Sequence, residues 1–339
     1  MKSKRILVLM HQDLVPPPEA KLVPEDRLNT PWTTEYDVIT ELKKIGHHVY
    51  PLGVYSDLKK IRQSIDEIKP HVVFNLLEEF DGESLFDSYV VSYLELLRIP
   101  YTGCNPRGLM IARDKALTKK ILSYHRLKTP KFFVSRKNRK LRKAPKNLSF
   151  PLIVKCLNEE ASLGLAKASI VQNEEKLFKR VEYIHKKIGV DAIIEEFIPG
   201  REFYVGIMGN YKLEVLPVWE VSYNKVDKPE QEFYSRAAKW NEKYRKRKGI
   251  KSGKAKIDAE LENKIYDIAK KTYKILDLNG YARIDVRVDD KDNIYVIEAN
   301  PNPNISWDDE FSESAHYKNI LKYPDVLEKI IKLGMNWHS

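Results

Sequence analysis

The chain has 339 residues, a length that is typical of two or three domains with a substantial buried core. Lys and Arg number 59 against 48 Asp and Glu, which gives a formal net charge of +11, and 42% of the residues are hydrophobic. This composition excludes wholesale disorder, and no apolar run reaches the ~18–20 residues that span a bilayer.

Two further features narrow the class of protein. The apolar run near the N-terminus is too short for a secretory signal and is better interpreted as a first strand. The two cysteines, Cys104 and Cys156, form no CxxC pair, which argues against a disulfide scaffold and a structural zinc site. We therefore expect a cytoplasmic protein that makes no membrane contact.

Strand and helix signals alternate along the first hundred residues. Apolar runs predict strands and helical spacing of apolar residues predicts helices, the first of which ends at Gly46. The expected strands are 6–10, 49–52, 72–74 and an extended stretch at 99–102, and the expected helices are 34–45, 58–68 and 85–97. This alternation predicts a parallel α/β sheet. A segment with four prolines between Asp13 and Trp32 is expected to be an irregular loop.

The rest of the chain is expected to form two further units. The second has a helix at 115–124 capped by Asp114, strands at 132–134 and 152–156, and a helix at 173–188. The third has strands at 192–197, 203–208 and 213–218, a polar loop at 224–256, an amphipathic helix capped by Asp258, strands at 281–288 and 294–299, and a helical C-terminus. We therefore expect domains at 1–103, 104–190 and 191–339.

The last two strands carry the pattern with the clearest chemistry. The sequence has neither a GxxxxGK[ST] loop nor a GxGxxG turn, so P-loop and dinucleotide enzymes receive no support. Because strand side chains alternate, Arg283 and Asp285 share one face and Glu298 and Asn300 share one face of the next strand. Two carboxylates beside an amide suit Mg²⁺, although a solvated hairpin with salt bridges would show the same pattern.

A metal site on this hairpin requires one particular strand register. If Val288 paired with Ile294 in a regular hairpin, the two carboxylates would point to opposite faces of the sheet. If Asp285 instead opposes Glu298, both carboxylates lie on one polar face. The metal hypothesis therefore requires a loop of even length or a β-bulge that restores this register.

Seven short motifs, taken in order, resemble those of the ATP-grasp superfamily, and most closely those of the D-alanine–D-alanine ligases. They are PYTG at 100–103, RDK at 113–115, FPLIVK at 150–155, IEEFIPGRE at 194–202, AAKW at 237–240, ARID at 282–285 and EANP at 298–301. The resemblance implies an α/β chain, with α+β character in its C-terminal part. It implies an ATP-grasp fold behind an N-terminal parallel α/β (pre-ATP-grasp) domain.

The resemblance also implies which residues act. For ATP, they are Lys115 and Lys155 at the phosphates, Glu195, Glu196 and Ile198 at the adenine, Glu202 at the ribose, and Phe233 and Lys239 in a loop that closes over the nucleotide. The metal ligands would be Asp285, Glu298 and Asn300, which would hold two Mg²⁺ ions, with Mn²⁺ as an alternative. The catalytic residues would be Arg283 and the amide of Asn304 at the acyl oxygen, and Ser162 in the loop at 158–164.

The implied reaction is amide formation through an acyl phosphate. ATP would phosphorylate a small amino-acid or peptide-like carboxylate, and an amine would then displace phosphate, with ADP as the other product. Magnesium would neutralise the transferred group, and loop closure would keep water from the intermediate. The sequence alone leaves the oligomeric state open, and a homodimer is compatible with the resemblance.

Both ends of the substrate site depart from the family pattern. Ala161 replaces a serine, Trp240 replaces a tyrosine, and the glycine-rich turn and glutamate after the first strand are absent. The serine that binds the acceptor carboxylate falls near the acidic run at 308–310. We therefore expect a carboxylate–amine ligase other than D-alanine–D-alanine ligase in the narrow sense, with a cationic or amine-rich acceptor.

Three alternatives stay open beside this interpretation. D-alanine–D-alanine ligase proper is the first of them. The second is nucleic-acid binding through the basic segments 136–146 and 239–256, which is weakened because they carry few interleaved aromatic residues. A non-catalytic scaffold is the third, and it is disfavoured because the phosphate and metal ligands that the resemblance implies are all present.

Overall fold

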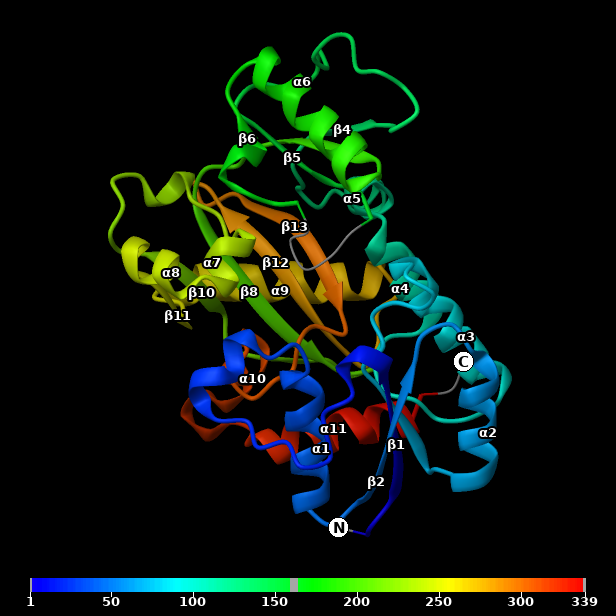
Figure 1. Cartoon of the computed structure of the whole chain (residues 1–339). Helices are drawn as coiled ribbons and strands as arrows, with labels where there is room; N and C mark the ends of the chain where they lie inside the picture. The colour runs from blue at the N-terminus through cyan, green and yellow to red at the C-terminus, as the bar shows by residue number, and fades with distance from the viewer. Residues whose placement is uncertain (1, 159–163, 338–339) are drawn as a thin grey trace.

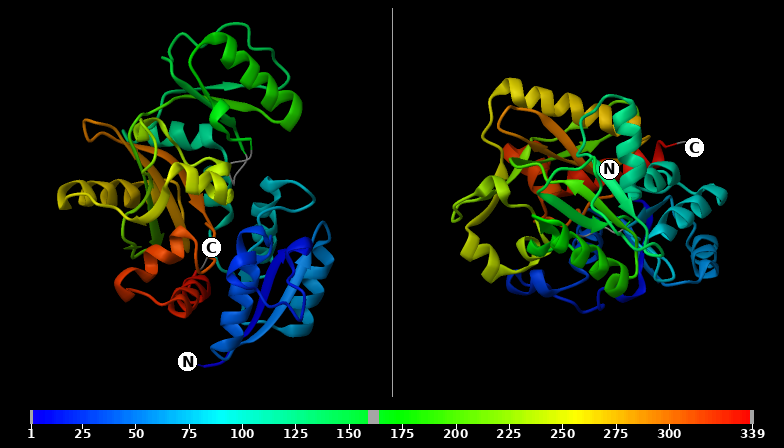
Figure 2. Two further views of the ribbon diagram at one scale, coloured as in Figure 1. Left: turned by 60° about the vertical axis from the view of Figure 1, so that its left-hand side comes forward. Right: turned by 90° about the horizontal axis from the view of Figure 1, so that it is seen from above.

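The computed structural model describes residues 2–158 and 164–337, without the side chains of Arg236 and Trp240. Within these residues the strands form three sheets, which Figure 1 shows as three successive parts of the molecule. The N-terminal part lies at the bottom of that view, the six-stranded sheet lies in the centre, and the four-stranded sheet lies at the top. The side view in Figure 2 separates the same three parts.

The N-terminal part contains the parallel sheet that the alternating pattern predicts. Its strands are β1 (Arg5–His11), β2 (His48–Val54) and β3 (Val72–Asn75), in the order β2-β1-β3 and all parallel, and its helices are α1 (Thr33–Lys44) and α2 (Leu58–Ile68). Residues Ile6 to Met10 are all buried, as expected for a strand that is covered on both faces. Tyr101 adds a parallel bridge to Val73, which accounts for the extended stretch at 99–102.

A run of helices connects this part to the rest of the chain. These helices are α3 (Asp87–Leu96), α4 (Pro106–Arg113) and α5 (Lys115–Tyr124). Asp114 accepts hydrogen bonds from the amides of Ala116 and Leu117, so the predicted cap of α5 is confirmed. Helix α4 was not expected, although Asn105 caps it and Pro106 stands in its first turn, where proline is well tolerated.

The four-stranded sheet is antiparallel and has the order β4-β7-β5-β6. Its strands are β4 (Phe132–Ser135), β5 (Leu152–Cys156), β6 (Ile170–Val171) and β7 (Ala192–Glu196). Helix α6 (Glu174–Tyr183), continued by a π-helical turn at Ile184–Ile188, packs Leu177 and Val181 against this sheet. Because β7 lies beyond residue 190, the boundary expected there would divide one continuous sheet.

The six-stranded sheet has the order β11-β10-β8-β12-β13, with β9 paired to β8. Its strands are β8 (Arg201–Met208), β9 (Glu214–Val215), β10 (Trp219–Tyr223), β11 (Ile250–Lys254), β12 (Tyr281–Val288) and β13 (Ile294–Pro301). Helix α9 (Ala259–Ile275) packs on one face, with Leu261 and Ile265 in the same core as Ile284. Asp258 accepts from the amide of Leu261, which confirms the predicted cap.

Two expectations in this region are wrong. The strand expected at 213–218 is only the short β9, and the chain leaves the pairing near Pro217, which has no amide hydrogen to donate. The loop expected at 224–256 contains α7 (Arg236–Trp240), α8 (Glu242–Lys248) and β11. Strand β11 occupies the sheet edge, where polar residues such as Lys and Ser are well tolerated, so its composition resembled a loop.

The C-terminal helices return the chain to the N-terminal sheet. These are α10 (Glu310–His316) and α11 (Tyr323–Met335). Ile330 of α11 shares a core with Ile6, Val38 and Phe74 of the N-terminal part, and also with Tyr281 of β12. Within the described residues, no helix has both the length and the apolar character needed to cross a membrane.

Candidate active site

A pocket lies between the four-stranded and six-stranded sheets. Strands β5 and β7 supply one wall, and β8, β12 and β13 supply the other. The residues expected from the sequence that line it are Lys115, Lys155, Glu195, Glu196, Ile198, Glu202, Phe233, Lys239, Arg283, Asp285, Glu298 and Asn300. Asn304 does not line it, and Ser162 lies outside the described residues. The fold therefore gathers in one place residues that the sequence spreads over almost two hundred positions.

The hairpin of β12 and β13 meets the register condition through a β-bulge. Val288 pairs with Ile294, so the loop has five residues and the even-length alternative is wrong. The register then shifts between Asp285 and Val286, so that Asp285 pairs with Glu298. As a result Ile297 and Glu298, which are neighbours in sequence, both line the pocket, although successive side chains of a regular strand point to opposite faces.

Asp285 is tightly held by its neighbours on this face. Arg283 donates to both of its carboxylate oxygens, with Nε 2.8 Å from Oδ1 and Nη2 3.0 Å from Oδ2. The amide nitrogen of Asn300 donates to Oδ2 at 3.0 Å. Burial raises the pKa of Asp285 to about 6, the Arg283 guanidinium opposes this rise, and the nearby Glu298 adds to it.

Glu298 is in the opposite electrostatic situation. Lys115, the first residue of α5, places its ammonium 2.9 Å from Oε1 of Glu298. Burial by itself would raise the pKa of Glu298, but the ammonium groups of Lys115 and Lys155 lower it to about 2. Glu298 is therefore ionised at neutral pH and lies directly across from Asp285.

The chemistry of these side chains fits a divalent cation with oxygen ligands. No group of three or more His, Cys, Asp or Glu that could hold a metal occurs in the described part of the chain. Two carboxylates and an amide are nevertheless enough for Mg²⁺, which usually takes its remaining ligands from water and from substrate phosphates. Because Glu298 raises the pKa of Asp285, a cation between them would relieve a repulsion that the protein itself contains.

Glu195 lies on the opposite wall of the pocket, on β7, between two ammonium groups. It is 1% exposed, with Lys155 Nζ 2.9 Å from Oε2 and Lys119 Nζ 3.2 Å from Oε1. The sequence interpretation missed Lys119. A usable signal was present, because Lys119 follows Lys115 by one helical turn and so falls on the same buried face of α5.

Arg287 is a second residue that was missed. Its Nη1 lies 2.9 Å from Oε2 of Glu202, and it donates to the carbonyls of Gly200, Glu230 and Glu232. It thereby ties the expected ribose-binding carboxylate to the turn that precedes Phe233. The signal here was the period of two on β12, which places Arg287 on the same face as Arg283 and Asp285.

Phe233 and Lys239 come from the region beyond β10. Phe233 is 9% exposed and packs with Ile153 and Phe197, so that it joins the two walls of the pocket. The ammonium of Lys239 lies 5.3 Å from the centre of the Tyr234 ring. Both side chains line the pocket.

The structure describes the surroundings of two residues expected at the acceptor end, Asn304 and Asp308. Asn304 lies at the junction with the N-terminal part, where its Oδ1 accepts from the Thr34 hydroxyl at 3.0 Å and from the Ser306 amide at 2.8 Å. Asp308 already has a cationic partner within the protein, because Arg27 donates to both of its oxygens at 2.8 Å. Arg27 belongs to the proline-rich segment, so only a tertiary contact could reveal this pair.

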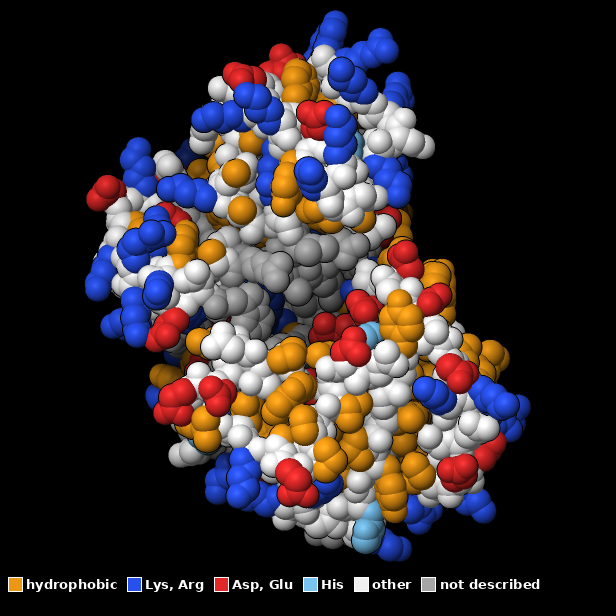
Figure 3. All heavy atoms as spheres, in the orientation of Figure 1, with side chains coloured by type: hydrophobic (Ala, Val, Ile, Leu, Met, Phe, Trp, Pro, Cys, Tyr) orange, Lys and Arg blue, Asp and Glu red, His pale blue; other side chains and the backbone are white. Residues whose placement is uncertain are grey.

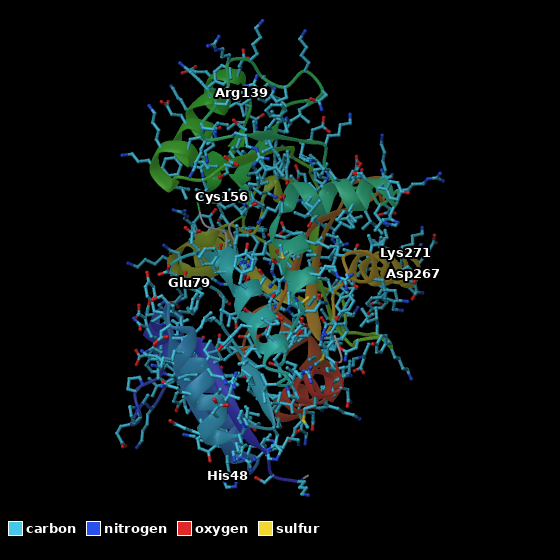
Figure 4. All side chains as sticks on the ribbon, turned by 90° about the vertical axis from the view of Figure 1, so that its right-hand side faces the viewer. His48, Glu79, Arg139, Cys156, Asp267 and Lys271 are labelled. Atoms are coloured by element: carbon cyan, nitrogen blue, oxygen red, sulfur yellow. The ribbon has the colours of Figure 1, made fainter. Side chains whose placement is uncertain are left out.

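The basic segment at 136–146 lies far from the pocket. Arg139 points outward from the end of the four-stranded part in Figure 4, whereas Cys156, which lines the pocket, lies at the inner end of this part. On the face shown in Figure 3, Lys and Arg side chains cover the outer margins, and several Asp and Glu side chains gather near the centre. The basic segment therefore forms no part of the pocket.

Comparison with known proteins agrees with this geometry. A family model described as D-ala D-ala ligase C-terminus matches residues 117–332. The D-alanine–D-alanine ligase of Pelagibacter ubique is 30% identical over 88% of this chain and 91% of its own length. The uncharacterized protein y4sG of Sinorhizobium fredii is 33% identical over 69% of this chain and 66% of its own length.

Solved structures extend the likeness to the whole fold. The crystal structure of D-alanine–D-alanine ligase from Bacillus anthracis superposes with a TM-score of 0.77 and 25% identity, covering 98% of both chains. The three sheets and the pocket between two of them define an ATP-grasp enzyme. The chain belongs to the D-alanine–D-alanine ligase family, and it is an ATP-dependent, ADP-forming carboxylate–amine ligase. Enzymes of this family use ATP and a divalent metal ion, and the nucleic-acid alternative is not favoured.

Proposed function

We propose that this enzyme joins a small amino-acid or peptide-like carboxylate to an amine in the cytoplasm, in the pocket between the four-stranded and six-stranded sheets. The observation that carries this proposal is the register of β12 and β13, which sets Asp285 opposite Glu298 beside Lys115. Acidic oxygens next to a lysine match a nucleotide whose phosphates are bound together with a cation.

The nucleotide would lie between the two sheets. Lys115 and Lys155 supply positive charge at the phosphates, and Glu202, held by Arg287, is available to the ribose hydroxyls. Glu195, together with the backbone of Glu196 and Ile198, would lie beside the adenine, and Phe233 and Lys239 would cover the nucleotide. The apolar contacts of Phe233 with Ile153 and Phe197, on the four-stranded side of the pocket, support this placement.

Asp285, Glu298 and Asn300 would hold the metal, which we propose to be two Mg²⁺ ions, with Mn²⁺ as a substitute. The bound cation would neutralise the phosphoryl group during its transfer. Asp285 and Asn300 are already oriented by hydrogen bonds, so little reorganisation is needed when the cation binds. Asp285 must lose its proton to bind the cation, and its pKa of about 6 allows that at neutral pH.

Arg283 would stabilise the negative charge that develops on the acyl oxygen. Its guanidinium is fixed by two hydrogen bonds to Asp285, and it lines the pocket next to the carboxylate pair. A donor that is held in place before the reaction costs no reorganisation during it. The backbone amide of Asn304 and the hydroxyl of Ser162 stay as predicted contributors at the same reacting centre.

The acceptor is proposed to carry a positive charge or an additional amine. With Asp308 paired to Arg27, this proposal depends on the next acidic residues, Asp309 and Glu310. Burial, and after it the neighbouring Glu310, raise the pKa of Asp309 well above its ordinary value, so a cation bound beside this pair would favour the ionised form of Asp309. Glu310 Oε2 lies 3.9 Å from Arg283 Nη1, so this acidic pair adjoins the proposed catalytic arginine.

An ADP-release screen tests both parts of the proposal. Purified enzyme with ATP and Mg²⁺ is offered amino acids, dipeptides and polyamines in pairs, and the products are identified by mass. We expect ADP and phosphate with a new amide, and the highest rates with basic or amine-rich acceptors. Release of AMP and pyrophosphate would contradict the reaction, whereas efficient formation of D-alanyl-D-alanine would contradict only the acceptor class.

The division into domains also stays a proposal. We place the boundaries near residues 103 and 197, because the second position keeps β4 to β7 together in one sheet. This shift of a few residues leaves Glu195 and Glu196 on the four-stranded side of the pocket, opposite Asp285 and Glu298.

A further inference from the structure

Lys119 is a buried cation whose contacts connect the two walls of the pocket. Its side chain is 1% exposed, and it is absent from the pocket lining, whereas Lys115 and Lys155 are part of that lining. Burying an ammonium is costly unless each of its protons finds an acceptor. Direct contact with the nucleotide therefore does not explain why a lysine is buried at this position.

Three acceptors surround this ammonium. Nζ lies 3.0 Å from the carbonyl oxygen of Ile297, 3.2 Å from the hydroxyl of Thr129 and 3.2 Å from Oε1 of Glu195. The contacts with Ile297 and Thr129 are hydrogen bonds, and the contact with Glu195 is an ion pair that balances the charge of the ammonium. The three acceptors belong to β13, to the segment after α5, and to β7, so one side chain joins both sheets to the helix that carries Lys115.

The contact with Ile297 falls on the residue at which the hairpin changes register. Ile297 has no partner on β12, because Asp285 pairs with Glu298 while Val286 pairs with Val296. The extra residue of a bulge leaves the regular ladder, so its polar groups need other partners. Lys119 supplies the partner for the Ile297 carbonyl, and it does so next to the carboxylate that must turn toward Asp285.

We propose that Lys119 is a positioning residue for the metal site, acting by holding the Ile297 bulge and so keeping Glu298 on the same face as Asp285. Glu195 supplies the negative charge that lets the ammonium stay buried there. This inference rests on the proposed role of Asp285 and Glu298 in binding Mg²⁺. On this inference, Lys119, which does not line the pocket, determines how the carboxylates of Asp285 and Glu298 are placed within it.

The test measures how Mg²⁺ changes the affinity for ADP, by calorimetry in the absence of carboxylate and amine substrates. In Lys119→Met, the Mg²⁺ concentration that gives half of the gain in ADP affinity should rise about 10–100-fold, the usual cost of losing a residue that orients metal ligands. Lys120→Met is the matched control, because Lys120 is the next residue of α5 and is exposed. It should leave that concentration unchanged.

A purely structural role predicts a different result. General loosening would weaken ADP binding equally with and without Mg²⁺ and would leave the half-saturating Mg²⁺ concentration as in the unaltered enzyme, which would overturn the proposal. Thr129→Val removes one of the three acceptors and should raise that concentration by a smaller factor. It decides the question alone if Lys119→Met does not fold.

The outcome for the unaltered enzyme separates this inference from the proposed function. If Mg²⁺ does not increase the affinity of the unaltered enzyme for ADP, the proposed metal site itself is wrong. If Mg²⁺ increases that affinity equally in the unaltered enzyme, Lys119→Met and Thr129→Val, only the role of Lys119 is wrong.

Discussion

At the scale of single residues, the pocket contains two facing carboxyl groups whose surroundings shift their pKa values in opposite directions. Burial raises the pKa of Asp285 to about 6, while ammonium groups overcome the effect of burial on Glu298 and lower its pKa to about 2. Glu195 shows the same effect as Glu298, since burial would raise its pKa and Lys119 and Lys155 reverse the direction. Perturbed groups that converge in one pocket are typical of a functional site rather than of a solvated surface.

The first prediction at this scale concerns Lys155. Its ammonium lies 2.9 Å from Glu195 and its side chain is 14% exposed, so it can reach a bound phosphate from the pocket wall. Lys155→Met should lower the rate of ADP release about 100–1,000-fold, because a positioned charge at the reacting group is lost. The measurement is steady-state ADP release, with circular dichroism to verify the fold.

Lys176→Met provides the control for this prediction. Lys176 lies on α6 of the same part of the molecule and is exposed, so its loss removes an equal charge away from the pocket. ADP release should not change in this variant. A folded Lys155→Met enzyme that retains the full rate would refute the assigned role of Lys155.

At the scale of elements, the decisive feature is the bulge in β13. Without it, the five-residue loop would leave Glu298 facing away from Asp285, and the pocket would lose one of its two opposed carboxylates. The helices are specified more locally, since Asp114, Asp258 and Asn173 each accept hydrogen bonds from amides of the helix that they precede. Such caps can be predicted from the sequence because the capping side chain bonds to amides only two or three residues further along the chain.

The second prediction tests one of these caps. Asp258→Ala removes the acceptor for the Leu261 amide at the start of α9, and it should destabilise the protein by about 1 kcal/mol. The measurement is the free energy of unfolding in urea for the transition that includes α9. Asp267→Ala is the control, because Asp267 lies in the middle of the same helix, is exposed and is visible in Figure 4. An equal loss in both variants would mean that charge, rather than capping, matters.

At the scale of the whole molecule, a few side-chain contacts join segments that are distant in sequence. Arg27 is the clearest case, since it donates to both oxygens of Asp37 on α1 and to both oxygens of Asp308 before α10. The amide of Trp307 also donates to Asp37 at 3.0 Å. The proline-rich segment therefore connects helix α1 of the N-terminal part to the loop that borders the proposed acceptor site.

The third prediction follows from this network. Arg27→Met leaves Asp37 without its charged partner, and the side chain of Asp37 is only 6% exposed. Removing one member of a buried pair usually costs about 3–5 kcal/mol. We expect a lower unfolding temperature and faster proteolysis between residues 13 and 33.

The matched control for this prediction is Arg62→Met. Arg62 pairs with Asp66 on α2, and both side chains are more than half exposed, at 55% and 60%. Exposed pairs of this kind contribute little to stability because solvent screens the two charges, so the unfolding temperature should hardly change. Comparable losses in the two variants would show that the Arg27 network does not join the two parts of the molecule.

The sequence by itself determined most elements and most of the pocket. Helix α2 and strands β5 and β12 have the predicted bounds, because apolar periodicity and nearby breakers depend on neighbouring residues only. Twelve of the site residues that the family resemblance implies line the pocket, and all but Phe233 lie within the short motifs that carry the resemblance. Strand β11 and helix α8 were not predicted. One lies at a sheet edge and the other has no buried residue, so neither shows a clear pattern of apolar residues.

Tertiary structure alone decided how these residues face one another. Hairpin parity showed that a bulge or an even loop was needed, but the choice of the bulge depends on Lys119, which approaches the Ile297 carbonyl from a different element. The pairing of Asp308 with Arg27 likewise spans most of the chain. Local sequence patterns predict which face of a strand or helix a residue occupies. The bulge and the pairing of Asp308 depend instead on charged side chains from distant segments, which come within hydrogen-bonding distance only when the parts of the molecule pack together.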